Sequence, residues 1–411
     1  MKKILFIAYG GGHINIIDLV AEKLSDKKDI EFNILALTTA YNKIKDKYPK
    51  GVVKKLSDYK ELFQKSIEDI QQYGLELLDE NYHKSSGVSE EDTIFYIGVS
   101  MLDLVQKYGR KEANRLYGNK KRQAFLPVET MKKILKYEQV NVVVSTTSPR
   151  FEQASFIAAN ELGLKTIEIL DLFGELYPLP EAKHIVCMNK DIELSLRRQG
   201  LKNRRYYHFG QPVIENTVNK ILNINQNNLK KKLGLTNKKV LLFATQQPVI
   251  LNEDLTYGQY VGYDKINNQI FNLLLKLYKD FNISIILRVH PSENPKEYAK
   301  WIEKYPFVKI INDIATLEES LAVCDLLVNQ ASTVSVEAIS ANKPVFTFKS
   351  HLEKIYPLPA LTKIPFIFSD GFEELEYNLY LYLKGNLRIE TTSDFLQKHS
   401  IINIVKLIKE L

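Results

Sequence analysis

The stretch KKILFIAYGGGHINIIDLVAEKL, from Lys2 to Leu24, decides the fold class. Its apolar run Lys3–Tyr9 has the length and composition of a buried strand, and three glycines end it. A second apolar run follows at Phe32–Leu37. Between the two runs lie apolar residues at helical spacing, namely Ile16, Ile17, Val20 and Leu24. The order strand, glycine loop, helix, strand predicts an α/β protein with a parallel sheet and helices on both faces.

The size of the chain suits two domains. It has 411 residues, which is long for one hydrophobic core and fits two α/β domains of about 200 residues each. Hydrophobic residues make up 45% and charged residues 26%, which excludes a disordered chain. No apolar run approaches the roughly 18 residues of a transmembrane helix. The run Ile4–Tyr9 is too short for a signal peptide and ends in glycines, so we expect a cytoplasmic protein.

The few cysteines, the missing metal-binding motifs and the modest net charge limit which cofactors and partners the chain can have. The only cysteines, Cys187 and Cys324, lie in apolar segments, which predicts buried thiols rather than a disulfide framework. There is no Cys/His cluster with zinc spacing and no Asp-x-Asp pair, so we expect no metal ion and no other cofactor. The net charge of +7 suits a nucleotide diphosphate or a peripheral contact with an anionic membrane face. Because the lysines are dispersed, we expect no nucleic-acid partner.

The strand pattern is interrupted once. Between about 57 and 138 the sequence is helical, amphipathic and rich in apolar residues, which predicts a helical insertion and not a linker. The polar stretch Asn223–Asn228 predicts the boundary between domains at 1–222 and 229–390. The later expected strands of the first domain are Val140–Val144, Thr166–Leu170, His184–Met188 and Tyr206–Phe209.

The second domain repeats the alternation of strands and helices, and a last helical segment covers Phe395–Leu411. Its expected strands are Val240–Ala244, Ile283–Val289, Val308–Ile311, Asp325–Val328 and Val345–Phe348. Its expected helices are Asn268–Tyr278, Pro295–Tyr305, Leu317–Val323 and Ser332–Ala341. The fold class is therefore α/β, with two Rossmann-like parallel-sheet domains.

Ligands of parallel sheets bind beyond the carboxyl ends of the strands, so the residues that follow each strand are the candidates. Gly11 and Gly12 let backbone amides approach a ligand, and His13 can take a proton from an acceptor hydroxyl. The dinucleotide pattern Gly-x-Gly-x-x-Gly is excluded, because Asn15 stands at its third glycine. The alternative is a tight β–α turn with His13 facing solvent.

Two further places lie in the first domain. The run Ser145–Arg150 predicts N-capping of a helix that starts at Pro149. Ser148, Arg150 and Glu152 are candidates for contacts with an acceptor, and capping alone is the alternative. Asp171 ends the next strand as a second candidate base, with a turn-forming role as its alternative.

In the second domain, Thr245 and Gln246 follow the first strand and can hydrogen-bond a phosphate or a base. Arg288 and His290 end the next strand, where a basic pair suits a diphosphate and the following proline restricts His290. One of the two would contact the ligand and the other would support it.

The most informative stretch runs from Cys324 to Ala338. Its small hydroxyl residues Ser332 and Thr333 stand at a helix start, where they can cap and where free amides favour phosphate oxygens. Glu337 lies one turn beyond Thr333 and can accept hydrogen bonds from a ribose or sugar diol. The alternative is a capped core helix with a surface glutamate.

These motifs, with Gly11-Gly12-His13, resemble the GT-B glycosyltransferases that use nucleotide-activated sugars, including MurG-like and capsular or lipopolysaccharide transferases. The resemblance covers the chain loosely, from Lys2 to the closing helix. It implies that the second domain holds the nucleotide sugar, that the first presents the acceptor across a closing cleft, and that the closing segment 391–411 returns to the first domain. By resemblance, Ser332 and Thr333 hold the pyrophosphate, Glu337 holds the ribose, and His290 lies near the phosphates. Gly11, Gly12 and His13 would lie near the transferred sugar and the acceptor, and Gln330 is a further donor-binding candidate.

The resemblance implies metal-independent, inverting transfer from a UDP-sugar to a surface polysaccharide or glycolipid, with His13 as the base ahead of Asp171 and Glu152. The insertion departs from MurG, so the acceptor is not carried over. Gln330-Ala331-Ser332 replaces the glycine pair of the non-hydrolysing UDP-sugar 2-epimerases, which favours a transferase. The alternatives are a nucleotide-sugar epimerase or hydrolase, a CDP-polyol phosphotransferase, and a catalytically silent nucleotide- or sugar-binding protein.

Overall fold

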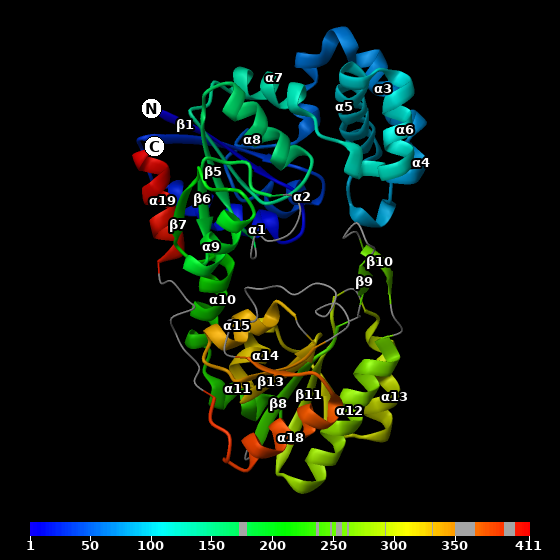
Figure 1. Ribbon diagram of the computed structural model, residues 1–411, viewed down its shortest axis with the longest axis vertical. Helices are drawn as coiled ribbons and strands as arrows, with labels where there is room; N and C mark the ends of the chain where they lie inside the picture. The colour runs from blue at the N-terminus through cyan, green and yellow to red at the C-terminus, as the bar shows by residue number, and fades with distance from the viewer. Residues whose placement is uncertain are drawn as a thin grey trace. The chain divides into compact units, whose positions relative to one another are not determined.

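The computed structural model describes residues 1–171, 179–235, 238–246, 249–251, 257–260, 263–291, 293–330, 332–349, 366–389 and 399–411. The chain divides into two compact units (Figure 1). The first comprises Met1–Val213 and Gln397–Leu411, and the second comprises Ile214–Leu396. This division falls before the polar stretch Asn223–Asn228.

The first unit is built on a parallel sheet of seven strands in the order β3-β2-β1-β4-β5-β6-β7. β1 pairs with β2 in register from Lys2 opposite Ile30 to Ala8 opposite Ala36, and with β4 on its other side. Each predicted strand is present, shifted by one or two residues. The strands are β1 (Lys2–Ala8), β2 (Ile30–Ala36), β3 (Val53–Lys54), β4 (Val142–Thr146), β5 (Lys165–Ile169), β6 (His184–Cys187) and β7 (Arg205–His208).

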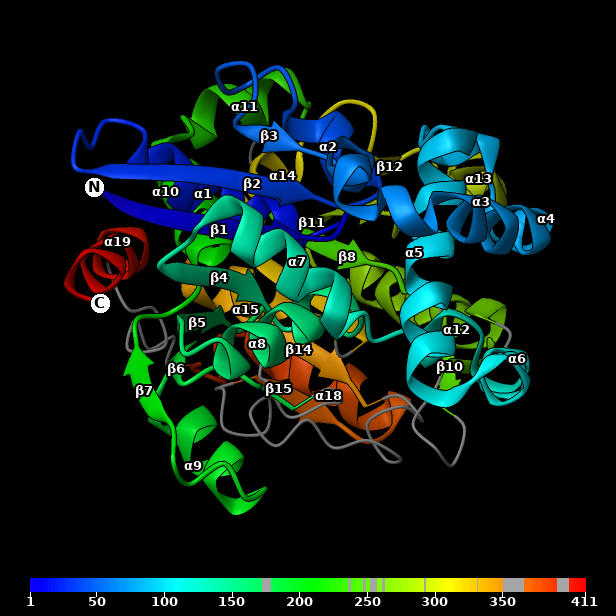
Figure 2. The ribbon, with the colours of Figure 1, turned by 90° about the horizontal axis from the view of Figure 1, so that it is seen from above.

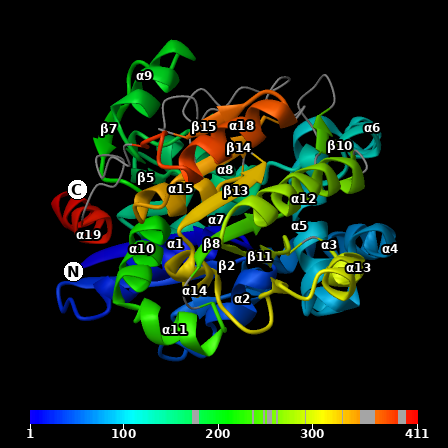
Figure 3. The same cartoon turned by 90° about the horizontal axis from the view of Figure 1, so that it is seen from below.

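One face of this sheet is covered by α1 (His13–Leu24) and the closing helix α19 (Ser400–Glu410), seen side by side in Figure 3. Both helices share an apolar cluster with Ile4 and Phe6 of β1. Lys2 Nζ also donates hydrogen bonds to the carbonyl oxygens of Ile408 and Lys409. The closing helix therefore packs back onto the first unit, as predicted. The part of its predicted span before 399 lies outside the described residues.

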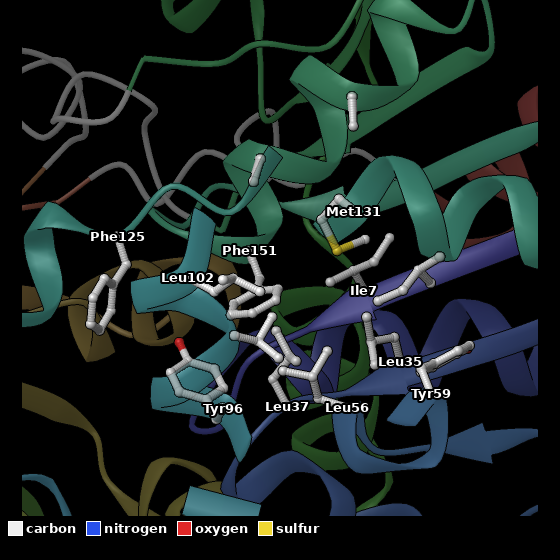
Figure 4. Packing of buried hydrophobic residues seen from close by; sticks show 14 of the residues in the cluster. Ile7, Leu35, Leu37, Leu56, Tyr59, Tyr96, Leu102, Phe125, Met131 and Phe151 are labelled. Carbon is white, nitrogen blue, oxygen red and sulfur yellow. The ribbon is translucent and has the colours of Figure 1, made fainter. Parts of the chain in front are cut away.

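The opposite face carries α7 (Val128–Glu138) and α8 (Phe151–Glu161), which lie over the strands in Figure 2. The helical insertion joins the same core, because Tyr59 and Tyr96 pack in one cluster with Ile7 and Leu35 of the sheet (Figure 4). The insertion is therefore part of the fold and not a linker. Its elements are η1 (Leu56–Ser66), α3 (Ile67–Glu76), α4 (Leu78–Asn81), η2 (Lys84–Ser86), α5 (Glu90–Tyr108), α6 (Arg110–Lys120) and η3 (Lys121–Ala124), and α2 (Thr39–Ile44) precedes it.

The second unit has six parallel strands in the order β12-β11-β8-β13-β14-β15. They are β8 (Lys239–Ala244), β11 (Ile283–Arg288), β12 (Val308–Ile310), β13 (Leu326–Gln330), β14 (Val345–Phe348) and β15 (Ile367–Ser369). An antiparallel pair, β9 (Val249–Leu251) and β10 (Tyr257–Tyr260), stands apart from this sheet. β9, β10 and β15 were missed in the sequence, as was the helix α18 (Phe372–Leu383) that follows β15.

Helices α12 (Tyr263–Asp280), α13 (Ala299–Lys304) and α18 pack through one apolar cluster on a face of this sheet. α14 (Leu317–Val323) contacts β8, and α15 (Val334–Ser340) contacts β13 and β14. The other helical elements are α9 (Lys190–Arg198) of the first unit, α10 (Pro212–Asn223), and, in the second unit, α11 (Gln226–Lys232) and η4 (Pro295–Tyr298).

Both sheets have the doubly wound order in which the first strand stands between the second and the fourth. The direction of winding therefore reverses between β1 and β4 in the first unit and between β8 and β13 in the second. Loops leave such a point in opposite directions, and ligands of open parallel sheets bind there, beyond the carboxyl ends of the strands. The prediction of two Rossmann-like parallel-sheet domains is confirmed.

Candidate functional sites at the two switch points

In the first unit, His13 connects the two strands of the switch point. It begins α1 directly after the loop that leaves β1, and its Nδ1 lies 2.9 Å from Thr146 Oγ1 at the end of β4. The same nitrogen lies 3.9 Å from Asp171 Oδ2, just beyond β5. The structure thus brings together His13 and Asp171, as the predicted acid–base site requires. Thr146 was not singled out in the sequence, where it is one hydroxyl in a run of several.

The glycine loop beside His13 is open. Gly11 has a φ of +72°, a left-handed conformation that favours glycine, and Lys43 Nζ donates a 3.0 Å hydrogen bond to its carbonyl oxygen. A Cβ atom built on Gly11 or Gly12 would meet nothing within 4 Å. Gly10 differs, because a Cβ there would lie 1.8 Å from Thr39 Oγ1. Gly11 and Gly12 therefore leave room for a ligand, whereas Gly10 serves packing.

The electrostatic setting of His13 favours its neutral form. Burial lowers the pKa of the imidazole, the Asp171 carboxylate raises it by a smaller amount, and the Arg150 guanidinium lowers it again. A neutral imidazole held by a hydroxyl on one nitrogen can accept a proton at neutral pH. The site can therefore supply a general base.

Glu152 lies behind the loop rather than on its open side. The residue is 1% exposed, and its Oε1 accepts a 2.6 Å hydrogen bond from the backbone N–H of Tyr9. Its Oε2 is buried and has no hydrogen-bond partner among the described residues. Burial raises the pKa of this carboxyl to about 7, against the hydrogen bonds to the backbone and the nearby Arg150 charge. Because Glu152 is buried, its side chain cannot contact an acceptor directly. It supports the Tyr9 loop instead.

The loop after β4 differs from the prediction. α8 begins at Phe151, and its N-cap residue is Arg150, whose side chain makes no capping hydrogen bond. Pro149 therefore precedes the helix, and the predicted capping by the hydroxyl run is wrong, because Arg150 turns the chain through a φ of +74° before the helix starts. The Arg150 guanidinium lies 4.9 Å from the centre of the Tyr9 ring. Ser148 is buried, and its hydroxyl donates a weak 3.4 Å bond to the Pro149 carbonyl oxygen.

In the second unit, a buried polar network joins the ends of β8 and β11. The Thr245 N–H donates a 3.0 Å bond to the carbonyl oxygen of Arg288, and the His290 N–H donates a 3.1 Å bond to Thr245 Oγ1. The Thr245 hydroxyl in turn donates to a carboxylate oxygen of Glu293, which also accepts from the His290 N–H at 3.2 Å. Thr245 and His290, both predicted ligand residues, are thereby held next to one another.

The network extends to β13 and α12. Gln330 Nε2 donates to the Gln246 carbonyl oxygen at 3.2 Å and to Asn267 Oδ1 at 2.7 Å. Asn267 Nδ2 donates to the Gln246 carbonyl oxygen at 3.2 Å and more weakly to Glu293 Oε1 at 3.4 Å. Gln330 and Asn267 are both 1% exposed, so these bonds are made away from water. Sequence reasoning missed Asn267 and Glu293, because neither directly follows an expected strand: Asn267 stands just before the expected helix Asn268–Tyr278, and Glu293 stands three residues beyond His290.

Arg288 supports the sheet. Its Nη1 donates to the Ala315 carbonyl oxygen at 2.9 Å and to Ser320 Oγ at 3.1 Å, and burial lowers the pKa of the guanidinium. These contacts tie the end of β11 to α14. Of the predicted pair, Arg288 therefore has the supporting position and His290 remains the candidate for a ligand contact.

The hydroxyl side chains of the β13–α15 connection do not cap the helix that follows. Thr333 is the N-cap residue of α15, yet its side chain makes no capping hydrogen bond, so the predicted capping by Ser332 or Thr333 is wrong. Asn329 holds this connection instead, donating to Ser335 Oγ at 2.7 Å and accepting from Thr347 Oγ1 at 2.7 Å. Thr333 is exposed and Ser332 partly exposed. On α15, burial and then the Glu318 carboxylate raise the pKa of Glu337 to about 7.

No group of three or more His, Cys, Asp or Glu side chains that could hold a metal ion exists among the described residues. Within the same part of the chain, no helix is both long enough and apolar enough to cross a membrane.

Comparison with known proteins gives matches in structure alone. No family model and no curated protein sequence matches the chain. The UDP-GlcNAc 2-epimerase from Neisseria meningitidis bound to UDP-GlcNAc matches with a TM-score of 0.62 and 11% identity. The UDP-GlcNAc 2-epimerase from Methanocaldococcus jannaschii matches with a TM-score of 0.60 and 13% identity, and Acinetobacter baumannii MurG with 0.55 and 12%. Each match covers 100% of both chains.

The chain has the GT-B fold. Its structural relatives are nucleotide-sugar enzymes, and epimerases predominate among them. At 11–13% identity these matches establish the fold and nothing finer.

Proposed function

We propose that the chain is an enzyme that acts on a nucleotide-linked sugar, with a UDP-sugar favoured, bound by the second unit. The observation that carries the proposal is the polar network at the β8/β13 switch point, which holds Thr245, Gln246, His290 and Gln330 around one sheet edge. Such edges are where nucleotides bind in doubly wound sheets. The partly exposed Ser332 and Thr333 would contact the pyrophosphate, as the resemblance to GT-B enzymes implies.

Glu337 is the proposed ribose contact, and its ionisation predicts how nucleotide affinity changes with pH. Its pKa is raised to about 7, so the carboxyl is partly protonated at neutral pH without ligand. Ribose hydroxyls that donate to the carboxylate stabilise its charged form. We therefore expect affinity for the nucleotide to rise as the pH increases through 7.

The first unit would supply the acid–base chemistry. His13 is the proposed base, and the Asp171 carboxylate stabilises the imidazolium that forms when His13 takes a proton. Gly11 and Gly12 would leave space for the sugar beside it. The same groups serve two reactions, namely inversion at a sugar carbon and attack by an acceptor hydroxyl.

Epimerisation of the nucleotide sugar is the candidate that the comparisons favour. The relatives from N. meningitidis and M. jannaschii are UDP-GlcNAc 2-epimerases, and they have higher TM-scores than MurG. Inversion at carbon 2 by proton removal requires that the nucleotide diphosphate leave carbon 1 with its bonding electrons, and that it add back when a proton returns to the opposite face of carbon 2. His13 could remove the first proton.

Glycosyl transfer is the second candidate, and a different observation favours it. A cavity of about 410 Å³ lies between the sheet of the first unit and the helical insertion, which gives room for an acceptor. By the resemblance stated above, Gln330-Ala331-Ser332 also replaces the glycine pair of the 2-epimerases, which favours a transferase.

A thermal-shift panel with UDP, CDP, GDP, TDP and CMP tests the binding step. A ligand at 100 times its dissociation constant adds about 2.7 kcal/mol to the free energy of unfolding. We expect UDP to stabilise the wild type and Glu337→Ala to lose most of this gain. Glu376→Ala, which removes an exposed ion pair with Lys276, is the matched control. If no nucleotide stabilises the wild type, the proposed function is wrong.

Incubation with UDP-GlcNAc in D₂O then separates the reactions. Deuterium at carbon 2 together with the C2 epimer identifies an epimerase. UDP release that depends on an added acceptor identifies a transferase, and release without an acceptor identifies a hydrolase. Binding of UDP with none of these products would leave a catalytically silent binding protein.

A further inference from the structure

The cavity of the first unit is lined by other residues than those that form the two switch-point sites. It measures about 410 Å³, within the range of small-molecule sites. Its lining comes from the residue after β1, the end of β2, α2 and the helical insertion. The lining includes hydroxyl and amide groups, among them those of Thr38, Asn42 and Ser57, and the rings of Tyr9, Tyr41 and Tyr96. Such a lining suits a ligand that has several hydroxyl groups and an apolar face, as a sugar ring does.

The walls of the cavity are tied together by hydrogen bonds. Asn42 Nδ2 donates a 2.7 Å bond to the Gly87 carbonyl oxygen, which links α2 to the loop before α5. Lys55 pairs with Asp92 at 2.9 Å, and Asp92 also accepts hydrogen bonds from the hydroxyls of Ser57 and Ser89. The opposite charges of Lys55 and Asp92 therefore cancel within the wall.

Arg122 is the lining cation whose charge is not cancelled. Its Nε donates to Asn81 Oδ1 and its Nη2 to the Asn81 carbonyl oxygen. Asn81 is buried and is itself fixed by bonds from its Nδ2 to the Leu77 carbonyl oxygen and to Tyr117 OH. Across the described part of the chain no carboxylate forms an ion pair with Arg122. The guanidinium is thus held in place by neutral groups, and its positive charge remains available.

Tyr96 adds a phenol hydroxyl to the lining of the same cavity. The residue is 6% exposed, and its ring packs against Phe151 with centroids 5.0 Å apart (Figure 4). Its hydroxyl makes no hydrogen bond to any residue that the structure describes. Both Arg122 and Arg150 lie close enough to act on the charge of this phenol. Because it has no partner in the described part of the chain, this hydroxyl can hydrogen-bond a ligand in the cavity.

We propose that this cavity binds a sugar that carries an anionic group, a carboxylate or a phosphate, as the acceptor end of a second substrate. Arg122 would receive the anion, Tyr96 would hydrogen-bond to it or to a ring hydroxyl, and the tyrosine rings would cover the apolar face of the sugar. The proposal rests on the transferase candidate, because a transferase requires an acceptor and an epimerase does not.

Calorimetric titration of the full chain with glucuronate, glucose 6-phosphate, glucose and inorganic phosphate tests the cavity. At least one anionic sugar should bind about tenfold or more tightly than glucose, since a charge-assisted bond to arginine contributes about 1.4 kcal/mol or more. The preferred anionic sugar tells whether the anion is a carboxylate or a phosphate. If inorganic phosphate binds as tightly as the better sugar, or if neither anionic sugar binds better than glucose, the inference is wrong.

Two substitutions test whether the anionic sugar binds in this cavity. Arg122→Gln should weaken the anionic sugar about tenfold and leave glucose unchanged, and Tyr96→Phe should weaken it about threefold without removing packing. Arg115→Gln, which loses only an exposed pair with Glu112, is the matched control. Wild-type affinity in both Arg122→Gln and Tyr96→Phe would overturn the assignment. UDP thermal shifts on the same variants separate the two proposals, because intact UDP binding with no anionic-sugar binding refutes the cavity alone.

Discussion

The two switch points of this molecule have the same strand order but differ in how their side chains are held by hydrogen bonds. In the second unit, Thr245, Glu293, Asn267 and Gln330 form a continuous network of hydrogen bonds, most of it buried. In the first unit, His13 makes one short contact, to Thr146, beside glycines that face open space. A network of this kind fixes loop positions before a ligand arrives, whereas a titratable side chain with few hydrogen bonds can change its protonation state.

This difference indicates how two sheets of the same topology can suit different tasks. The first unit contains two titratable groups with displaced pKa values: burial lowers the pKa of His13 from its ordinary value of 6.5, and burial raises the pKa of Glu152 to about 7. The corresponding edge of the second unit is lined mainly by amides and hydroxyls. We propose that one unit binds the nucleotide and the other carries out proton transfer, and the first predictions below test this division.

The largest effect is expected from His13→Ala. Loss of a general base lowers kcat by about 10²–10⁴-fold. UDP binding, measured by thermal shift, should stay unchanged, because His13 belongs to the other unit. Lys23→Ala, at an exposed position of the same helix, is the control. A kcat close to that of the wild type would remove His13 from the chemistry.

The pH profile sharpens this prediction. Since a neutral imidazole is the active form and burial lowers its pKa, kcat/KM should fall only below the ordinary pKa of histidine. Asp171→Asn removes the carboxylate that raises this pKa, so the acid limb should move to lower pH. An acid limb that moves to higher pH would contradict the assignment.

The next largest effect is expected from Glu293→Ala in the second unit. The variant leaves the Thr245 hydroxyl and the amide of His290 without their carboxylate acceptor, which should lower the free energy of unfolding by about 3 kcal/mol. UDP affinity should fall as well, while Glu297→Ala, an exposed neighbour, should change neither. Denaturant unfolding measures the first quantity. If stability falls and UDP affinity does not, the network supports the sheet and not the ligand site.

A pH-dependent stability difference is expected from Glu152→Gln. The folded state holds the Glu152 proton up to a pKa of about 7, above the ordinary value of 4.5, so the folded state is destabilised progressively as pH rises from about 4.5 to 7. Glutamine cannot ionise, so the variant should gain up to about 3 kcal/mol relative to the wild type at pH 8 and little at pH 4.5. Glu161→Gln, an exposed position on the same helix, is the control. Parallel stability curves from pH 4.5 to 8 would refute the burial of this charge.

The smallest effect is expected from Gly98→Ala, which strains the insertion behind the cavity. A Cβ atom there would lie 1.9 Å from the Ile70 carbonyl oxygen, so α3 and α5 would have to separate, at a cost of about 1–3 kcal/mol. Gly118→Ala has nothing within 4 Å and should be neutral or slightly stabilising. Thermal unfolding of the two variants measures the difference. Equal stability would mean that the helices do not pack this closely.

Much of the fold could be predicted because its signals are local. Buried parallel strands are short apolar runs, and the strand Val345–Phe348 has the predicted bounds, as does the helix Leu317–Val323. The strand β15 and the helix α18 were missed, since Ile367–Ser369 is short and carries no glycine or alternation that marks it. At the sites, His13, Asp171, Thr245, Gln246, His290 and Gln330 were singled out because they follow strands. The roles of Arg288 and Glu152 were not predictable, because burial and partners depend on residues distant in the chain.

The sequence by itself determined the two parallel-sheet units, the helical insertion and the strand ends at which chemistry can occur, because apolar periodicity and glycine loops are written in neighbouring residues. Only the tertiary structure decided which of those side chains are available to a ligand. Glu152 is buried under the Tyr9 loop, Arg288 donates a hydrogen bond to Ser320, and Arg122 has no counter-ion among the residues that the structure describes. Each outcome depends on contacts between segments far apart in the chain, and burial and pairing energies arise from those contacts.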